Sequence, residues 1–115
     1  MKILNFGSCN IDYVYSLDHI VEVGETETTH KFETFPGGKG LNQSIAVAKA
    51  GVKVYHAGCV GNDGDMLINI LKENGVDVSY INRTQEKNGH AIIQVSNRGE
   101  NSIFLYPGSN EMISK

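Results

Sequence analysis

The stretch that decides the interpretation of this sequence is Gly37-Gly38-Lys39-Gly40-Leu41-Asn42-Gln43. It leads into the alanine-rich run Leu41–Ala50, whose apolar spacing predicts a helix, and Gly51 stands where a C-terminal helix cap belongs. A glycine cluster at a helix start leaves backbone N–H groups free to point at a ligand, and the absence of Cβ atoms lets that ligand come close. Asn42 falls in the first turn, where its amide can both donate and accept hydrogen bonds.

Two common glycine motifs do not fit this stretch. A P-loop needs Ser or Thr directly after its lysine, but Gly40 follows Lys39. A dinucleotide-binding fingerprint that starts at Gly38 fails because Gln43 occupies the position of the third glycine. The cluster is therefore a ligand-binding candidate of another kind.

A second candidate site follows the first apolar run, Ile3–Ser8, which reads as a buried strand. Asn10 and Asp12 are two residues apart, so in extended chain their side chains face the same way. A carboxylate beside a carboxamide suits hydrogen bonds to vicinal hydroxyl groups, because the ionised Asp accepts while Asn does either. The alternative is that Asn10 and Asp12 only form a turn and cap the backbone.

The remaining pattern predicts an α/β fold with a parallel sheet. Val52–Val60 reads as a second buried strand, and a helix that ends near Asn74 follows it, with Asp63 as the expected cap and Gly75 as the stop signal. The order strand, crossover with helix, strand, helix is typical of such sheets.

Two segments break this α/β pattern. Glu22–Phe35 alternates between threonine-rich and charged positions and predicts exposed antiparallel strands. The runs Ala91–Val95 and Ser102–Tyr106 read as a hairpin joined by polar residues. These strand pairs are expected to form a separate small sheet beside the main one.

Composition excludes several classes of function. The 115 residues carry a formal charge of −3 with no basic stripe, so we expect no nucleic-acid partner. No apolar segment is long enough to span a membrane, and the apolar stretch at the N-terminus is too short for a secretory signal. We therefore expect no membrane association. Cys9 and Cys59 read as buried free thiols, which favours a cytoplasmic protein. The four histidines, which include His56, lack metal-ligand spacing, so no metal site is expected.

Taken together, these stretches resemble the ribokinase branch of the phosphofructokinase-B-like carbohydrate kinases. The residues that carry the resemblance span the whole chain in order: Asn10-Ile11-Asp12, Gly24-Glu25-Thr26, Gly37–Gln43, Gly58–Gly64, Gly75-Val76-Asp77, Gly99-Glu100-Asn101 and Pro107–Asn110. The resemblance implies a ribokinase-like α/β fold, in which a parallel sheet with flanking helices carries a small antiparallel lid sheet.

The resemblance also implies a set of substrate-binding residues. Asn10 and Asp12 would hydrogen-bond sugar hydroxyls, and Gly38, Lys39 and Asn42 would close on the sugar from the helix side. The residues that would shape or cover the site are Ile11, Gly37, Gly40, Leu41, Ala91 and Phe104. For Lys39, the alternative is a solvated lysine at a loop tip.

By the same resemblance, residues 1–115 would be the N-terminal part of a ribokinase-like domain, with lid segments at about 13–36 and 89–107. Lid strands of this branch commonly pair between subunits, which implies a homodimer and gives exposed strand edges a purpose.

The resemblance implies an ATP-dependent sugar kinase that uses Mg²⁺, with a monovalent cation as a further candidate. In the family, the catalytic base is an aspartate in a Gly-Ala-Gly-Asp-like segment, and no part of this sequence resembles that segment. We therefore expect no catalytic residue within these 115 residues and no activity from them alone, with the nucleotide-binding, catalytic half absent. The alternative is a non-catalytic sugar-binding or dimerisation module. Ribose is the leading sugar, with fructose, other pentoses and nucleosides left open.

Overall fold

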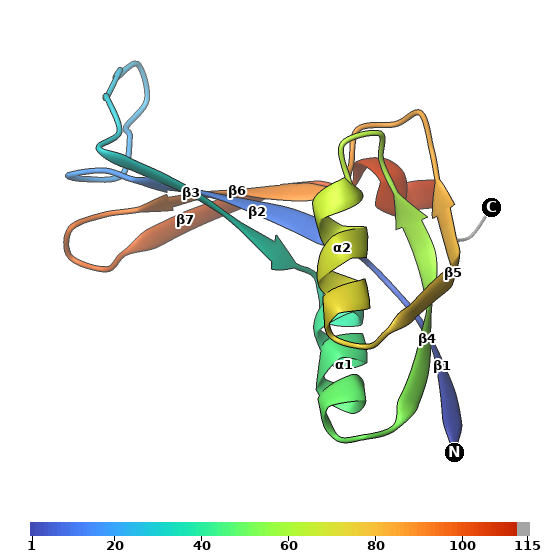
Figure 1. Ribbon diagram of the computed structural model, residues 1–115. Coiled ribbons are helices and arrows are strands. Elements are labelled where there is room, and N and C mark those ends of the chain that lie inside the picture. Colours follow the sequence, from blue (N-terminus) through green and yellow to red (C-terminus); the bar gives the residue numbers. More distant parts are fainter. Residues whose placement is uncertain (113–115) are drawn as a thin grey trace.

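The computed structural model describes residues 1–112 as two connected parts (Figure 1). One part, the α/β body, consists of β1 (Lys2–Phe6), α1 (Lys39–Lys49), β4 (Lys53–Val60), α2 (Asp65–Glu73) and β5 (Asp77–Arg83). The other part, the lid sheet, consists of β2 (Asn10–Ser16), β3 (Lys31–Gly37), β6 (His90–Val95) and β7 (Asn101–Tyr106). A short 3₁₀ helix, η1 (Gly108–Met112), follows the lid sheet.

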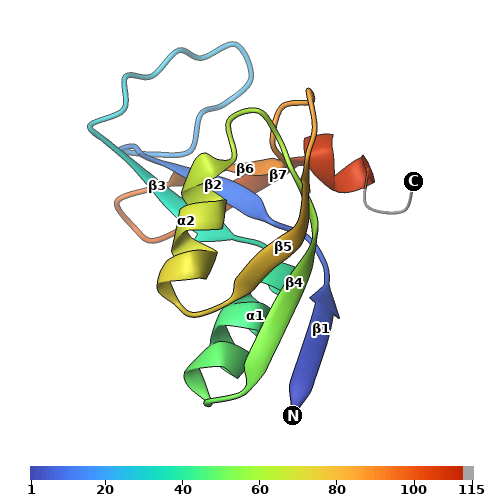
Figure 2. The same cartoon turned by 45° about the vertical axis from the view of Figure 1, so that its right-hand side comes forward.

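The α/β body is built on a three-stranded parallel sheet in the order β1-β4-β5. Both helices lie on the same face of this sheet (Figure 2). The apolar side chains of α1 and α2 that face the sheet pack against β4 in one core. On α2 these side chains recur at helical spacing and form an apolar stripe. The fully buried apolar side chains of these three elements are Leu41, Val54, Val60, Leu67 and Leu71.

The lid sheet extends away from the body and has the strand order β3-β2-β6-β7. The outer pairs are antiparallel hairpins, whereas the central pair, β2 and β6, is parallel. The sequence predicted the hairpin of β6 and β7 and a separate small sheet, and both predictions are confirmed.

Three local features differ from the prediction. The alternating segment expected to be strand from Glu22 onward is irregular until β3 begins at Lys31, because the loop is held by turn and side-chain hydrogen bonds instead of a partner strand. Strand β5 was not foreseen, since its half-exposed residues lack a continuous apolar run. Asp63 does not cap α2; the cap position is Gly64 without a side-chain bond, and Asp63 Oδ1 accepts the N–H of Asn88 at 2.8 Å.

One face of the body sheet has no helix over it in the described residues. Leu4 is 62% exposed and Phe6 60% exposed, although the sequence predicted a buried strand here. The side chains of β1 alternate between the two faces of the sheet, and those of Ile3 and Asn5 point toward the helices. A shallow hollow on the bare face is lined by Lys2, Ile3, Leu4, Phe6, Tyr55, Ala57 and Tyr80.

Cys9 and Cys59 are buried free thiols, as the sequence predicted. Burial, with a contribution from nearby Cys59, raises the pKa of Cys9 to about 12, so that thiol stays neutral. No helix in the described residues is long and apolar enough to span a membrane.

Candidate functional site

The start of α1 packs directly against the loop that leaves β1. The N–H of Leu41 donates to the carbonyl of Ser8 at 3.0 Å. A Cβ placed on Gly40 would lie only 2.6 Å from the Ser8 nitrogen, so only glycine permits this approach of two backbones. The glycine cluster foreseen at the helix start is thus a contact surface for the residues that precede Asn10.

Asp12 lies on β2 with its carboxylate over Gly37. A Cβ on Gly37 would lie 2.6 and 2.7 Å from the two carboxylate oxygens, so the missing side chain makes the space that the carboxylate occupies. Within residues 1–112 no hydrogen bond or salt bridge engages the Asp12 side chain, and its partial burial raises the pKa of the carboxyl above its ordinary value. The carboxylate is therefore a free hydrogen-bond acceptor next to a helix start.

Asn10 lies on the same face of β2 as Asp12, two residues before it. Its Oδ1 accepts a hydrogen bond of 2.5 Å from the Nδ2 of Asn110, which comes from η1. The amide is held in place by a residue distant in sequence, and the interpretation of Asn10 as only a local turn residue is wrong.

The loop before β6 supplies a residue that sequence reasoning missed. Asn88 is fully buried and uses its side chain to join three loops. Its Nδ2 donates to the carbonyls of Cys9 (3.1 Å) and Gly89 (2.8 Å), and its Oδ1 accepts from the N–H of Gly61 (2.8 Å). A lone Asn in a polar stretch gives no signal of this role, because the partners are backbone groups that only the fold brings together.

A buried chain of polar side chains lies beneath the site. Asn5 Nδ2 donates to Ser44 Oγ at 2.9 Å, and Ser44 Oγ lies 2.7 Å from Nδ1 of the fully buried His56. Because the Gly7 carbonyl can only accept, His56 donates from Nε2 to it at 3.1 Å and accepts from Ser44 at Nδ1. Burial lowers the pKa of His56, which keeps the ring neutral. These hydrogen bonds connect β1, α1 and β4.

The predicted residues around α1 divide into a buried and an exposed group. Gly37, Gly40, Leu41 and, on β2, Ile11 are buried, whereas Lys39 and Asn42 are exposed. The backbone N–H of Asn42 donates to the Gly38 carbonyl at 3.0 Å, which places it in the first turn, next to the glycines that border Ser8 and Asp12. The structure therefore brings Asp12 and the first turn of α1 to one place.

The two predicted lid residues lie on opposite faces of the lid sheet. Ala91 is the register partner of Asp12, and it is buried on the same face. Phe104 pairs with Ile92, one position further along β6, so its side chain emerges on the other face. The prediction that Phe104 covers the same site as Asp12 was therefore wrong; Leu105, the partner of Ala91, occupies that face.

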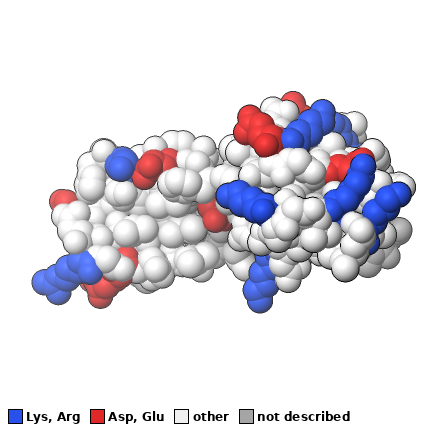
Figure 3. All heavy atoms as spheres, turned by 60° about the horizontal axis from the view of Figure 1, so that its bottom comes forward, with Lys and Arg blue, Asp and Glu red and all other residues white. Residues whose placement is uncertain are grey.

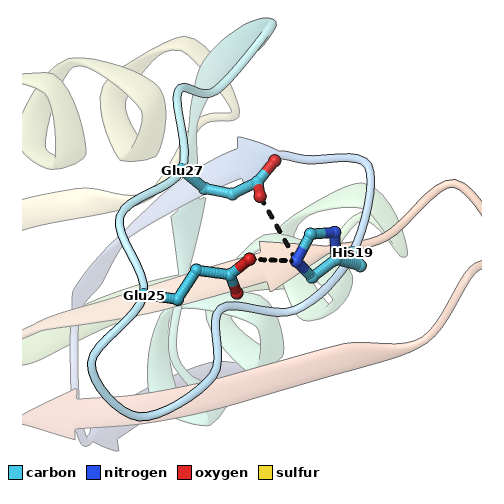
Figure 4. A group of neighbouring side chains, drawn as sticks. All are labelled: His19, Glu25 and Glu27. Atoms are coloured by element: carbon cyan, nitrogen blue, oxygen red, sulfur yellow. Dashed lines mark hydrogen bonds and ion pairs between the residues drawn. The ribbon is translucent and has the colours of Figure 1, made fainter.

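One group of side chains in the described residues is close enough to hold a metal ion (Figure 4). His19 Nε2 lies 2.7 Å from Glu25 Oε2 and 3.2 Å from Glu27 Oε2, all within the loop between β2 and β3. The hydrogen bond to Glu25, with the neighbouring carboxylates, raises the pKa of His19, which favours the imidazolium ion. A protonated His19 between two carboxylates accounts for this group without a metal.

The geometry defines a class of site. An acceptor carboxylate and a carboxamide lie on one strand face, a glycine-lined helix start faces them, and a small lid sheet carries the strand. Such a set of groups suits a ligand with several hydroxyl groups.

Comparison with known proteins agrees with that class. The family profile described as pfkB family carbohydrate kinase matches residues 1–115, and the chain belongs to this family. It is 40% identical to the ribokinase of Haemophilus influenzae over 112 residues, and 38% identical to that of Bacillus subtilis over 113 residues. The matches cover 95% and 94% of this chain.

Solved structures show the same fold. The ribokinase of Cryptococcus neoformans in complex with ADP matches with a TM-score of 0.88 and 40% identity over 94% of this chain. The ribokinase of Arabidopsis thaliana complexed with ribose and ATP matches with a TM-score of 0.85 and 31% identity over 95% of it. The chain spans only 37% and 38% of the two bacterial relatives, and 35% and 36% of the two structures.

Proposed function

We propose that this chain is the sugar-binding part of an ATP-dependent kinase that phosphorylates a sugar hydroxyl. The observation that carries the proposal is the Asp12 carboxylate, which has no protein partner within residues 1–112 and lies against Gly37 at the start of α1. A partly buried carboxylate without a partner is costly unless a ligand supplies the missing hydrogen bonds. A sugar hydroxyl is a suitable donor.

In this proposal each site residue has a role that its position supports. Asp12 accepts from a hydroxyl and Asn10 donates to a neighbouring oxygen, while Lys39 and Asn42 approach from the exposed first turn of α1. Ala91 gives an apolar floor beside Asp12. The backbone-shaping residues are Ile11, Gly37, Gly38, Gly40 and Leu41. Phe104 has no role in this site, because its side chain lies on the face of the lid sheet opposite to Asp12.

Ribose is the sugar we propose first. Several relatives are named ribokinase, and one similar structure holds ribose together with ATP. A relative from Salmonella typhi that is 32% identical is named deoxyribokinase, so a pentose without one hydroxyl is the nearest competitor. Measuring the affinity for ribose and for deoxyribose side by side distinguishes the two sugars.

ATP and Mg²⁺ belong to the proposal for the whole protein. The only metal-competent group among residues 1–112 is His19 with Glu25 and Glu27 (Figure 4), in the loop that joins the Ser16 end of β2 to Lys31 of β3. These residues do not fit a magnesium–nucleotide site, because a protonated His19 already neutralises the two carboxylates. We propose that a polypeptide of residues 1–115 alone does not transfer phosphate, and that any monovalent cation binds elsewhere.

The exposed lid strands support a second part of the proposal, a homodimer in the cytoplasm. Ile103, Phe104 and Leu105 of β7 are 55%, 59% and 69% exposed. An apolar edge strand of this kind favours pairing with a second copy. A non-catalytic sugar-binding or dimerising module would use the same surfaces, and phosphate transfer by the longer protein distinguishes the two functions.

Calorimetry with ribose tests the sugar site. We expect Asp12→Ala to weaken binding by about ten- to a hundredfold, because a charged acceptor contributes roughly 1.5–3 kcal/mol. Asp65→Ala is the control, since Asp65 is exposed on α2. Equal ribose affinity in the wild type and Asp12→Ala would contradict the assignment. Phosphate transfer to ribose by residues 1–115 with ATP and Mg²⁺ would contradict the claim that they are inactive alone.

A further inference from the structure

Asn110 makes two side-chain contacts at the base of the lid sheet. It lies on η1, which follows β7, and its Oδ1 accepts the N–H of Cys9 at 3.1 Å. Its Nδ2 donates to Asn10 Oδ1 at 2.5 Å. One amide thus contacts both the residue before Asn10 and the Asn10 side chain itself.

The chemistry of these contacts determines which way each amide faces. A backbone N–H can only donate, so the atom of Asn110 that faces Cys9 must be the oxygen. The NH₂ group of Asn110 then faces Asn10, and because an NH₂ group cannot accept, Asn10 must turn its own oxygen toward it. The NH₂ group of Asn10 is left without a partner among residues 1–112 and is available to a ligand.

Neighbouring backbone groups hold Asn110 in this position. Its N–H donates to the Pro107 carbonyl, and the N–H of Ser109 donates to the Lys87 carbonyl, both at 3.0 Å. Gly89 leaves the space that the pair needs, since a Cβ there would collide with Asn110 Nδ2 and lie 3.0 Å from Asn10 Oδ1.

Side chains hydrogen-bond both backbone polar groups of Cys9. The N–H of Cys9 donates to Asn110 Oδ1, and the Cys9 carbonyl accepts from Asn88 Nδ2, both at 3.1 Å. Since Asn88 precedes β6 and Asn110 follows β7, the two ends of one lid hairpin hold the residue next to Asn10.

We propose that Asn110 is a positioning residue that orients the Asn10 amide as a donor beside the Asp12 acceptor. The inference rests on the proposed sugar-binding function. A donor next to an acceptor selects a ligand whose adjacent oxygens play the complementary roles, whereas two acceptors side by side require a donor from each oxygen.

The isosteric variant Asn110→Asp tests this orientation. The carboxylate that it introduces still accepts from Cys9 but cannot donate, so the Asn10 amide rotates and turns its oxygen toward the ligand. Asn10→Asp places an oxygen there as well, without any change at Asn110. We expect both variants to raise the KM for ribose by about ten- to a hundredfold in the kinase assay of the whole protein, with a smaller effect on kcat.

Two further results separate orientation from general damage. Acidification protonates the carboxylate of the Asn110→Asp variant and restores a donor, so its KM should approach the wild-type KM at the same low pH. Asn10→Asp should not recover in this way. Asn62→Asp, on the exposed turn after β4, is the control and should leave KM unchanged.

An NMR measurement without sugar tests the orientation directly. In the wild type the oxygen of Asn10 lies beside Gly89, so its NH₂ protons should show at most a weak Overhauser contact to the Gly89 α protons; in Asn110→Asp that contact should become strong. The inference is overturned if the contact is equally strong in both proteins, or if the wild type binds ribose and Asn110→Asp retains its KM. If the contact strengthens but the wild type binds no sugar, the orientation stands and the proposed function fails.

Discussion

The α/β body and the lid sheet belong to one chain but bury their side chains in different ways. In the body, Leu41, Val54 and Leu67 are completely buried between two helices and a sheet. In the lid sheet, most side chains of the four strands are half-buried or exposed, and Leu105 is 69% exposed. Basic side chains follow the same division: on the face shown in Figure 3, most of the Lys and Arg side chains lie over the body and fewer lie over the lid.

This difference shows where stability and recognition reside. The body has a core that can stabilise it through apolar burial. The lid sheet is held by strand pairing and by contacts at its base, where Asn88 and Asn110 reach Cys9. The site lies at the junction, with Asp12 on a lid strand and Gly37 at the entry to α1. Ligand binding is therefore expected to depend on the junction, and stability on the body.

The largest expected effect comes from the body core. Leu67→Ala should lower the free energy of unfolding by about 2–5 kcal/mol, because it opens a cavity at a fully buried position. The matched change in the lid sheet, Ile103→Ala, should cost less than about 1 kcal/mol, since Ile103 is 55% exposed. Urea denaturation measures both, and similar losses would contradict the division between body and lid.

The junction is tested next by Gly37→Ala. The added methyl group would occupy the space of the Asp12 carboxylate, which lies 2.6 Å from the Cβ position. We expect sugar affinity to fall by about tenfold, or roughly 1.4 kcal/mol, with a smaller change in stability. Calorimetry and urea denaturation on the same variant give the two values. A loss confined to stability would place the site away from the junction.

A buried histidine in the body predicts a dependence of stability on pH. Burial lowers the folded-state pKa of His56, so the unfolded chain binds more protons below its ordinary pKa of 6.5. Stability should be complete above pH 6.5 and decrease as pH falls from there toward the lowered pKa, by at most about 1.4 kcal/mol per pH unit. His56→Gln should reduce this slope, whereas His30→Gln, at an exposed position, should not.

The smallest effect is expected from the histidine of the lid loop, with the opposite sign. The hydrogen bond to Glu25 raises the pKa of His19, so its stabilising contribution is present below pH 6.5 and is lost as pH rises through the raised pKa. Titration by NMR should show that Glu25→Gln moves this pKa back toward its ordinary value. High salt should have a similar, weaker effect. A pKa that does not move would show that the ion pair does not form in solution.

The sequence predicted the body of the fold because its signals there are local. The helix after the glycine cluster, its end before Gly51 and the buried strand β4 all follow from periodicity and stop signals. Strand β5 was missed because residues such as Ser79 and Asn82 interrupt its apolar pattern. Its identity as a strand depends on pairing with β4, which no local pattern reveals.

The site was predictable only in part for the same reason. Asn10, Asp12 and the glycine cluster form compact motifs, so their residue types and spacing indicate their chemistry. Asn88 and Asn110 act on Cys9 from sequence separations of 79 and 101 residues, and nothing near them in the sequence reveals the partner. Phe104 was misplaced by one position, because a strand turns alternate residues to opposite faces and the register was not known.

The parallel pairing of β2 with β6 has a consequence for the order in which the chain acquires its structure. Its contacts join Ile11 to His90 and Ser16 to Val95, so a long loop of intervening residues must close before these contacts can form. Closing such a loop carries an entropic cost that short hairpins avoid, and contacts of this kind slow folding. During synthesis on the ribosome, the pairing of β2 with β6 must wait until β6 has emerged, while β1, α1 and β4 can already assemble. Pulse-labelling hydrogen exchange should therefore find the amides of Ile11 and Leu17, which donate to the carbonyls of Gly89 and Val95, protected later than those of α1.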